Sequence, residues 1–179
     1  PAGGAVVAPV LRARGGVEPS LRPAPEVTEI GKGKAIETGR WRVQAVEVPH
    51  AQPQLTCLAL RLDSDAGSLV YTGDTGPSKA LEKLAAGCDV LIHMCAYISG
   101  SVDNEATRIG TSGHLEAARA AAAAAARRLV ASHISNQFDR PGVREKVIAE
   151  MARVYDGVIV FGEDLMELSV DPEKPGVFR

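Results

Sequence analysis

Short apolar stretches, separated by turns and helix-forming segments, fill the chain from residue 41 onward. Between Trp41 and Val48 the apolar side chains recur with a period near two, and the stretch ends at Pro49 and His50, as a strand that runs into a loop does. Residues 55–62 and 68–72 predict two more strands, joined by a polar turn. Four shorter apolar runs predict further strands, at residues 90–93, 129–132, 158–161 and 165–170.

Three segments predict helices between these strands. Ser78 can cap a helix over residues 78–86, and residues 142–154 form another helical segment. The clearest helix covers residues 115–128, which hold an unbroken run of alanine, the residue with the best helix propensity. Residues 99–113 are polar and irregular, and long enough to predict a loop that borders a site. This succession predicts a layered α/β fold, with helices covering a sheet.

The first 39 residues differ in character. They contain several prolines and two Gly-Gly pairs with little apolar periodicity, so we expect residues 1–39 to be a mostly irregular N-terminal segment, with one short strand at residues 6–11. Residues 40–179 then form the α/β part. Because the start, Pro1-Ala-Gly-Gly, resembles neither a signal peptide nor a natural initiation site, we expect sequence upstream of it to be missing.

Composition and charge describe an ordinary globular protein with 45% hydrophobic and 23% charged residues. The formal net charge of -2 gives no broad positive field, so a nucleic-acid partner is possible but not indicated, and a membrane partner is not expected. No apolar run approaches the roughly 20 residues that span a bilayer. Cys57, Cys88 and Cys95 form no CxxC pair, and we expect free thiols in a cytoplasmic protein.

Candidate chemistry gathers where predicted strands end. His50, His93 and His133 stand at or just after strand ends, and Asp74 follows residues 68–72 in the same way. In open α/β sheets the loops at the carboxyl ends of strands converge, so these side chains can meet. Glycines on both sides of Asp74 permit a sharp turn. Imidazole and carboxylate together suit Zn²⁺, and equally Mn²⁺ or Fe²⁺. Taken singly, each residue also fits a structural histidine or a solvated strand-end aspartate.

Several motifs in a fixed order then resemble the second half of the metallo-β-lactamase superfamily, closest to its ribonuclease Z-like branch. The resemblance covers about residues 27–170. The motifs are Val48-Pro-His50, Leu69-Val-Tyr-Thr-Gly-Asp-Thr75, Val90-Leu-Ile-His93, Gly113-His114-Leu115 and Arg128-Leu-Val-Ala-Ser-His133.

The resemblance implies an αββα sandwich, of which this chain is the C-terminal half. It implies that His50, Asp74 and His133 are metal ligands, with Asp74 bridging two metals in the catalytic centre, two zinc ions in a complete site. It further implies that His114, at the opening of the long helix, is a catalytic residue that assists proton transfer during phosphodiester cleavage. A helix start suits this role, because its amide groups favour an anion such as a phosphate oxygen.

Two features depart from the family pattern. The HxHxDH motif, which supplies the remaining ligands and the aspartate that activates water, is absent from the sequence. Where ribonuclease Z has His-Glu-Ala-Thr, this chain reads His93-Met-Cys-Ala96 and lacks the glutamate. The first departure fits truncation, a split enzyme or a degenerate homologue, and the second weakens an assignment to tRNA processing itself.

We therefore expect a metal-dependent hydrolase of a small-molecule or phosphodiester substrate, with phosphodiesters preferred over ester-like compounds. Its dinuclear centre is completed by a missing N-terminal half or a companion chain. Because relatives of this branch are often dimers, we also expect a homo-oligomer. Two alternatives stay open: a degenerate half-domain that serves as a binding or assembly module, and a mononuclear 2-His-1-carboxylate iron enzyme using His50, Asp74 and His133.

Overall fold

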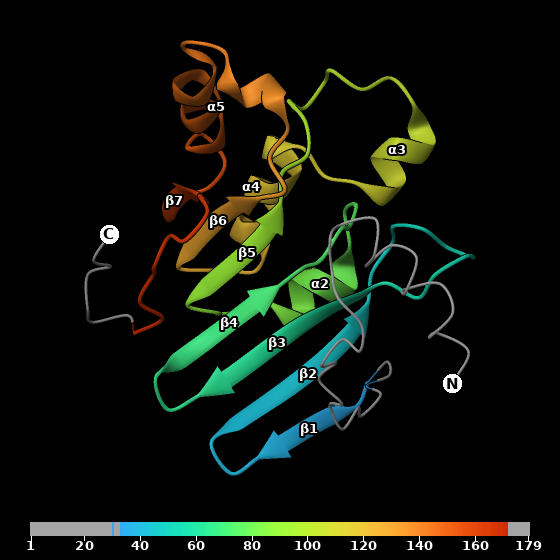
Figure 1. The fold of residues 1–179 in the computed structure, drawn as a ribbon, viewed down its shortest axis with the longest axis vertical. Coiled ribbons are helices and arrows are strands. Elements are labelled where there is room, and N and C mark those ends of the chain that lie inside the picture. The colour runs from blue at the N-terminus through green and yellow to red at the C-terminus, as the bar shows by residue number, and fades with distance from the viewer. Residues whose placement is uncertain (1–29, 31–32, 172–179) are drawn as a thin grey trace, which may run out of the picture.

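A single mixed sheet organises the described part of the chain, which is residue 30 and residues 33–171 of the computed structural model. The seven strands follow the sequence order across the sheet (Figure 1). Neighbours are antiparallel from β1 to β4 and parallel from β4 to β7. The strands are β1 (Ala35–Thr38), β2 (Trp41–Glu47), β3 (Leu58–Ser64), β4 (Gly67–Tyr71), β5 (Val90–Met94), β6 (Arg128–Ser132) and β7 (Val158–Phe161).

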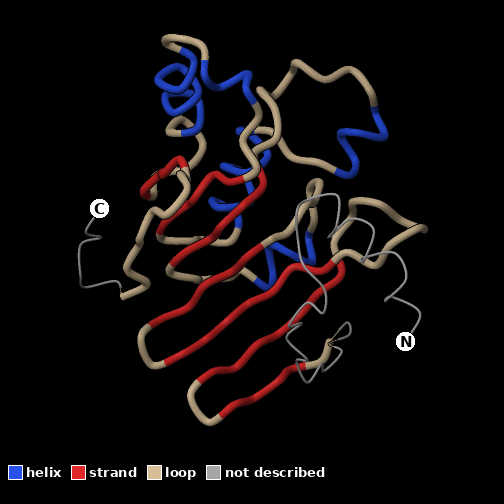
Figure 2. Tube along the Cα trace, in the orientation of Figure 1, coloured by secondary structure: helices blue, strands red, loops and turns tan. Residues whose placement is uncertain are grey.

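Helices cover one face of this sheet. The helix α2 (Lys79–Leu84) packs on β2 and β3, and α4 (His114–Ala123) packs on β5 and β6. The helix α5 (Val143–Met151) lies against α4, and Figure 2 shows these helices as the blue segments beside the red sheet. The arrangement confirms the α/β class predicted from the sequence. In the described part of the chain, every helix is too short or too polar to cross a bilayer.

The core lies between the sheet and α4. Leu91 and Leu129 of the central strands are 0% exposed, as are Ala117, Ala118 and Ala121 of the helix. Small alanine side chains let a helix backbone approach a sheet closely, so the alanine run serves packing as well as helix propensity.

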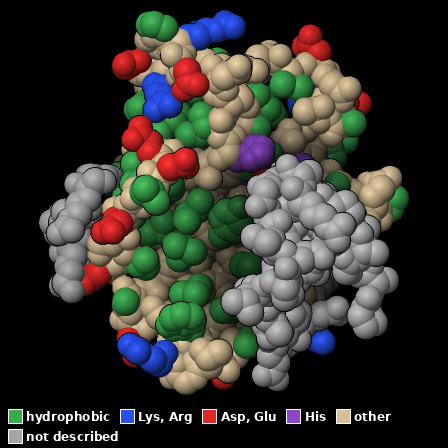
Figure 3. Space-filling view, viewed as in Figure 1, with side chains coloured by type: hydrophobic (Ala, Val, Ile, Leu, Met, Phe, Trp, Pro, Cys, Tyr) green, Lys and Arg blue, Asp and Glu red, His purple; other side chains and the backbone are tan. Residues whose placement is uncertain are grey.

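The opposite face of the sheet is apolar too. The register aligns one residue from each of six strands in a row: Ala45, Leu60, Tyr71, Ile92, Val130 and Val160. Several large apolar side chains here remain accessible, with Trp41 56%, Tyr71 49% and Val158 54% exposed. Figure 3 shows hydrophobic side chains gathered over the strands on this face. A face of this kind normally packs against another layer.

The prediction of a strand at residues 165–170 is wrong. Residues 165–170 are irregular, although their apolar side chains alternate. Met166 and Leu168 pack onto Val90, Val130 and Val160 of the sheet face. The guanidinium of Arg128 donates to the carbonyl oxygens of Ser169 and Asp171, so part of this backbone bonds a side chain. The alternating pattern therefore reflects a segment lying on the sheet.

The long helix also ends earlier than predicted. It stops at Ala123, whereas its alanine-rich sequence predicts a helix to residue 128. Ala125 adopts a positive φ of 50°, and Arg127 donates its backbone N–H to the carbonyl of Cys88. The chain must leave the helix here to enter β6, so tertiary structure overrides helix propensity.

Three short elements were not expected. The strand β1 lies in the segment predicted to be mostly irregular, and the rest of that segment, including the predicted strand at residues 6–11, lies outside the described residues. The helix α3 (Glu105–Gly110) interrupts the loop predicted at residues 99–113, and a 3-10 turn, η1 (Asn136–Asp139), precedes α5. The side chain of Asn104 caps α3 by accepting the N–H of Thr107.

Candidate functional site

Strand direction collects the candidate residues at one edge of the sheet. Because β2 and β4 are both antiparallel to β3, they run the same way, and β5 and β6 are parallel to β4. The arrows of all four strands point to the same edge in Figure 1. His50 follows β2, Asp74 follows β4 and His133 follows β6.

The carboxylate of Asp74 lies between the two histidines. Its Oδ2 is 3.7 Å from Nε2 of His50, and its Oδ1 is 3.7 Å from Nδ1 of His133. These separations are too long for hydrogen bonds. Two atoms bound to one metal at about 2.0–2.2 Å each, in tetrahedral geometry, lie about 3.3–3.6 Å apart. The spacing is therefore close to that of a pair of ligands on one ion.

A backbone carbonyl orients the His50 ring. Nδ1 of His50 lies 2.7 Å from the carbonyl oxygen of Gly110, which can only accept, so Nδ1 carries the proton and donates it. In the neutral ring Nε2 then presents a lone pair toward the carboxylate of Asp74. Two acceptors facing each other favour a cation between them, and a carbonyl behind the ring is the usual support of a metal-binding histidine.

The donor types fit a divalent metal, but the described residues supply few donors. Among these residues, no group of three or more histidine, cysteine, aspartate or glutamate side chains is close enough to hold an ion unaided. Asp74 is instead the shared member of two pairs, one with His50 and one with His133. The predicted role of the three residues as metal ligands stays a prediction.

Glycines allow the site loops to touch backbone to backbone. A Cβ on Gly76 would lie 1.8 Å from the carbonyl oxygen of Ile109, and a Cβ on Gly110 would lie 2.5 Å from that of His50. The N–H of Gly76 donates to the carbonyl of Pro49 at 2.9 Å. The loops after β2 and β4 and the end of α3 thus form one packed unit around the site.

Buried contacts of Thr75 stabilise the turn that carries Asp74. Thr75 is 0% exposed, its N–H lies 3.3 Å from Sδ of Met94, and its carbonyl accepts the hydroxyl of Ser112 at 2.8 Å. Gly73 has a positive φ of 59°, which glycine adopts without strain. Met94 stands where the resemblance would place a glutamate, and it supports the Asp74 turn.

His133 adopts an unusual backbone conformation. Its φ is +53°, in the left-handed region, where non-glycine residues are uncommon and histidine is among the more tolerant. Such conformations cluster at functional sites. The side chain is 58% exposed, so it stays accessible to a partner or ligand.

His93 is a core residue. It is 1% exposed, and its Nδ1 lies 2.8 Å from the carbonyl oxygen of Met94. Burial lowers the pKa of His93 from 6.5 to about 4, against the opposing effects of that hydrogen bond and the charge of Glu116. The ring is therefore neutral at pH 7.

His114 is the first residue of α4, as predicted from the sequence, and its side chain is fully buried. Its Nδ1 accepts the backbone N–H of Ser99 at 3.0 Å, so the proton sits on Nε2, which donates to Oε2 of Glu150 at 2.8 Å. Both ring nitrogens are engaged, and neither contact is to Asp74. Sequence reasoning missed Glu150, because a glutamate in a helical segment carries no signal of its own.

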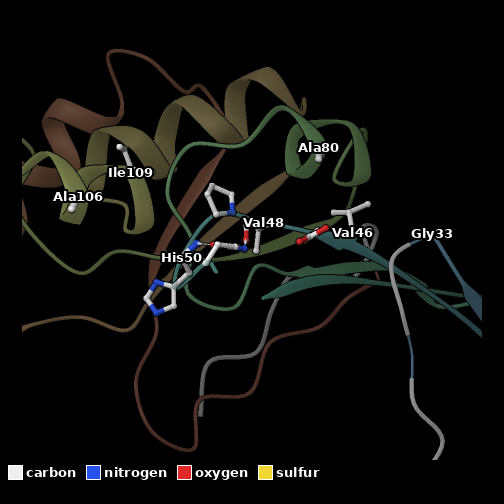
Figure 4. A pocket seen from close by; sticks show the side chains of 10 residues that line it. Gly33, Val46, Val48, His50, Ala80, Ala106 and Ile109 are labelled. Atoms are coloured by element: carbon white, nitrogen blue, oxygen red, sulfur yellow. Dashed lines mark hydrogen bonds between the residues drawn. The ribbon is translucent and has the colours of Figure 1, made fainter. Parts of the chain in front are cut away.

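A pocket of about 790 Å³ opens beside this edge of the sheet. His50 lines it, together with Val46 and Val48 on the β2 side and Ala106 and Ile109 of α3 (Figure 4). Its volume lies in the range of small-molecule sites.

Residues 3–134 match a protein family described as Beta-lactamase superfamily domain. The chain is 31% identical over 150 residues to Ribonuclease Z of Methanothermobacter thermautotrophicus, covering 84% of this chain and 44% of that protein. It is 30% identical over 157 residues to a Putative ribonuclease Z of Mycobacterium tuberculosis, covering 85% of this chain and 69% of that protein. The chain spans about half the length of the curated relatives it matches.

Solved structures are similar in fold. The metallo-beta-lactamase fold protein YhfI from Bacillus subtilis has a TM-score of 0.63 and 24% identity, covering 76% of this chain and 52% of that chain. Zn²⁺-bound PqqB from Methylobacterium extorquens has a TM-score of 0.54 and 16% identity, covering 84% and 54%.

Proposed function

Since this chain belongs to the beta-lactamase superfamily, in its ribonuclease Z-like branch, we propose that it supplies half of the active site of a metal-dependent hydrolase. The observation that carries the proposal is the carboxylate of Asp74, each of whose oxygens faces a different histidine at 3.7 Å. A carboxylate used in this way can bridge two ions, one toward His50 and one toward His133. The ions we propose are zinc, with manganese or iron as alternatives that metal analysis would separate.

The three candidate ligands would have different roles in this centre. His50 and His133 would hold the metal through a ring nitrogen, and the bond from Nδ1 of His50 to the carbonyl of Gly110 leaves Nε2 of His50 available as a ligand. Asp74 offers both oxygens, and the buried Thr75 beneath it limits its movement. When bound, the metal supplies a Lewis acid and an acidified water at neutral pH.

For His114 we propose a part in proton handling, with Glu150 as its partner. The proton on Nε2 of His114 lies on a hydrogen bond to Glu150, whose side chain is 28% exposed. The pair therefore links a buried imidazole to a carboxylate in contact with solvent. To exchange a proton with a substrate, the His114 ring must first break one of its two hydrogen bonds, either to Ser99 or to Glu150.

A companion half is the second part of the proposal. The chain covers about half of its curated relatives, and its sheet leaves Trp41 and Tyr71 accessible on the face opposite the helices. We propose that a polypeptide segment carrying HxHxDH packs on this face and completes the metal site. A second copy of this chain is the alternative occupant.

The substrate we propose is a phosphodiester first and an ester second. The relatives named Ribonuclease Z support the first choice. The net charge of -2 supports a substrate with little negative charge over a long polyanion. Free Cys57, Cys88 and Cys95 support the cytoplasm as its location.

The test is reconstitution. The chain is mixed with a separately made segment carrying HxHxDH, or expressed within the full-length gene product, and assayed on bis(4-nitrophenyl) phosphate and 4-nitrophenyl acetate with zinc or manganese. We expect turnover only with the companion, and its loss in Asp74→Ala but not in Asp65→Ala, which changes an exposed turn residue. Robust metal-dependent turnover by this chain alone contradicts the half-site proposal. A complex that binds no metal supports the non-catalytic module instead.

A further inference from the structure

The pocket beside His50 has walls from three elements. One wall is α3, through Ala106 and Ile109; another is Ala80 at the start of α2; and the floor lies along the end of β2, at Val46 and Val48. Figure 4 shows Ala106 and Ile109 on one side of His50 and Ala80 on the other. Ile109 is 58% exposed, so its side chain is accessible to a ligand in the pocket.

The described lining residues include no lysine or arginine. Phosphate groups of a nucleic acid are held mainly by these two side chains, through charge and paired hydrogen bonds. The polar lining side chains other than His50 are Glu47 and Gln52. The described lining of the pocket therefore suits an uncharged group better than a polyanion.

The same helix contacts both the pocket and the candidate ligand. Ala106 and Ile109 line the cavity, and Gly110, the next residue, accepts the proton of His50 Nδ1. A group lodged against Ile109 thus sits beside the histidine that we assign to the metal, which is where a substituent of the scissile ester or phosphodiester would lie.

We propose that this pocket binds an uncharged aromatic or branched aliphatic group of the substrate, so that the enzyme acts on small apolar esters or phosphodiesters rather than on RNA. This inference rests on the proposed function, because it names the substrate class of the same site.

The test measures binding without metal or turnover, so that its result stands apart from the test of catalysis. The probe is 1-naphthol, which is neutral at pH 7, titrated into the chain with ¹³C-labelled isoleucine methyl groups and followed by NMR. Hexaadenylate, a short polyanionic RNA, is titrated in parallel for comparison. We expect 1-naphthol to shift the Ile109 methyl signal at lower concentration than hexaadenylate does.

Matched variants locate the binding. Because Ile109→Asn removes the methyl signal, binding to the variants is followed through the fluorescence of 1-naphthol. Ile109→Asn should weaken 1-naphthol binding roughly fivefold to tenfold, as for loss of part of a buried aliphatic contact. Ile148→Asn, at a 39% exposed position on α5, should leave it unchanged. Ala106→Leu, which fills the cavity from an exposed position, should weaken binding as well and tests the site if Ile109→Asn misfolds.

Three outcomes would overturn the inference. One is an Ile109 signal that 1-naphthol leaves unmoved. Another is an Ile109 signal that moves with hexaadenylate at lower concentration than with 1-naphthol. The third is equal weakening of 1-naphthol binding by Ile109→Asn and Ile148→Asn. Failure of reconstituted hydrolysis with intact 1-naphthol binding would reject the proposed metal chemistry and leave the pocket assignment standing.

Discussion

Nδ1 of His50 lies 2.7 Å from the carbonyl oxygen of Gly110, 60 residues further along the chain. The contact makes α3, a helix of six residues, the support of a candidate metal ligand. Outer supports of this kind orient a histidine and commonly contribute a factor of about 10–100 in metal affinity.

Gly110→Ala should therefore weaken zinc binding by the reconstituted protein about 10–100-fold, because its Cβ would lie 2.5 Å from the carbonyl oxygen of His50 and must push the two loops apart. Isothermal titration with zinc measures the effect. Gly39→Ala is the control, since a Cβ there meets nothing within 4 Å. Unchanged zinc affinity in Gly110→Ala would mean that the loop contact does not orient the ligand.

His133→Asn should lower zinc affinity while the chain keeps its fold. Asparagine tolerates the positive φ of 53° at this position, so the backbone need not change, but its amide is a poorer zinc ligand than imidazole. Competition with a chromophoric chelator gives the affinity, and circular dichroism checks the fold. If His133→Asn binds zinc as tightly as the parent, His133 is not a ligand.

His114→Ala should reduce turnover of the reconstituted enzyme by roughly 10²–10⁴-fold with metal content unchanged, as expected for loss of a proton-transfer group. It should also destabilise the fold by about 1–3 kcal/mol, because the N–H of Ser99 loses its acceptor. Kinetics, metal analysis and urea unfolding separate these effects.

Glu150→Gln tests the partner of His114. Glutamine retains an oxygen that accepts the proton of Nε2, so stability should change little, while the pH profile of turnover should shift. Glu145→Gln, an exposed residue of the same helix, should behave as the parent. A pH profile identical in all three proteins would assign the pair a purely structural role.

Acid should destabilise the protein partly through His93. Its pKa in the folded state is about 4, below the unfolded value of 6.5, so between these values the unfolded chain binds more protons. The contribution of the buried neutral His93 ring to the free energy of unfolding is fully present above about pH 6.5. It is lost as the pH falls toward 4, and the total loss is about 3 kcal/mol. Urea unfolding at pH 7 and pH 4.5 should show a smaller loss of stability for His93→Gln than for the parent. An equal loss in both would place the acid sensitivity elsewhere.

The isolated chain should self-associate through the sheet face that carries Tyr71 and Val158, which are 49% and 54% exposed. Sedimentation velocity should show a mass that rises with concentration. The double variant Tyr71→Lys, Val158→Lys should reduce association, because it places charge on the apolar face. Ile148→Lys on α5 is the matched control. Association that survives the double variant would locate the contact on another surface.

The hydrophobic pattern was sufficient for the α/β class and for most strands, because burial on one face or both imposes a period that a sequence displays directly. The edge that gathers His50, Asp74 and His133 followed from the same pattern, since strand ends are set by turn residues such as Gly73. These features depend on neighbours in the chain, and local sequence encodes them.

Tertiary structure alone decided the rest. The bond from His50 to Gly110 and the pair of His114 with Glu150 join residues 60 and 36 positions apart, and no local period records such contacts. Packing also ends α4 at Ala123, although the alanine run continues to residue 126. Residues 165–170, predicted as a strand, instead pack Met166 and Leu168 on the sheet face. In each case burial and hydrogen bonding with distant segments outweighed a local propensity worth less than about 1 kcal/mol per residue.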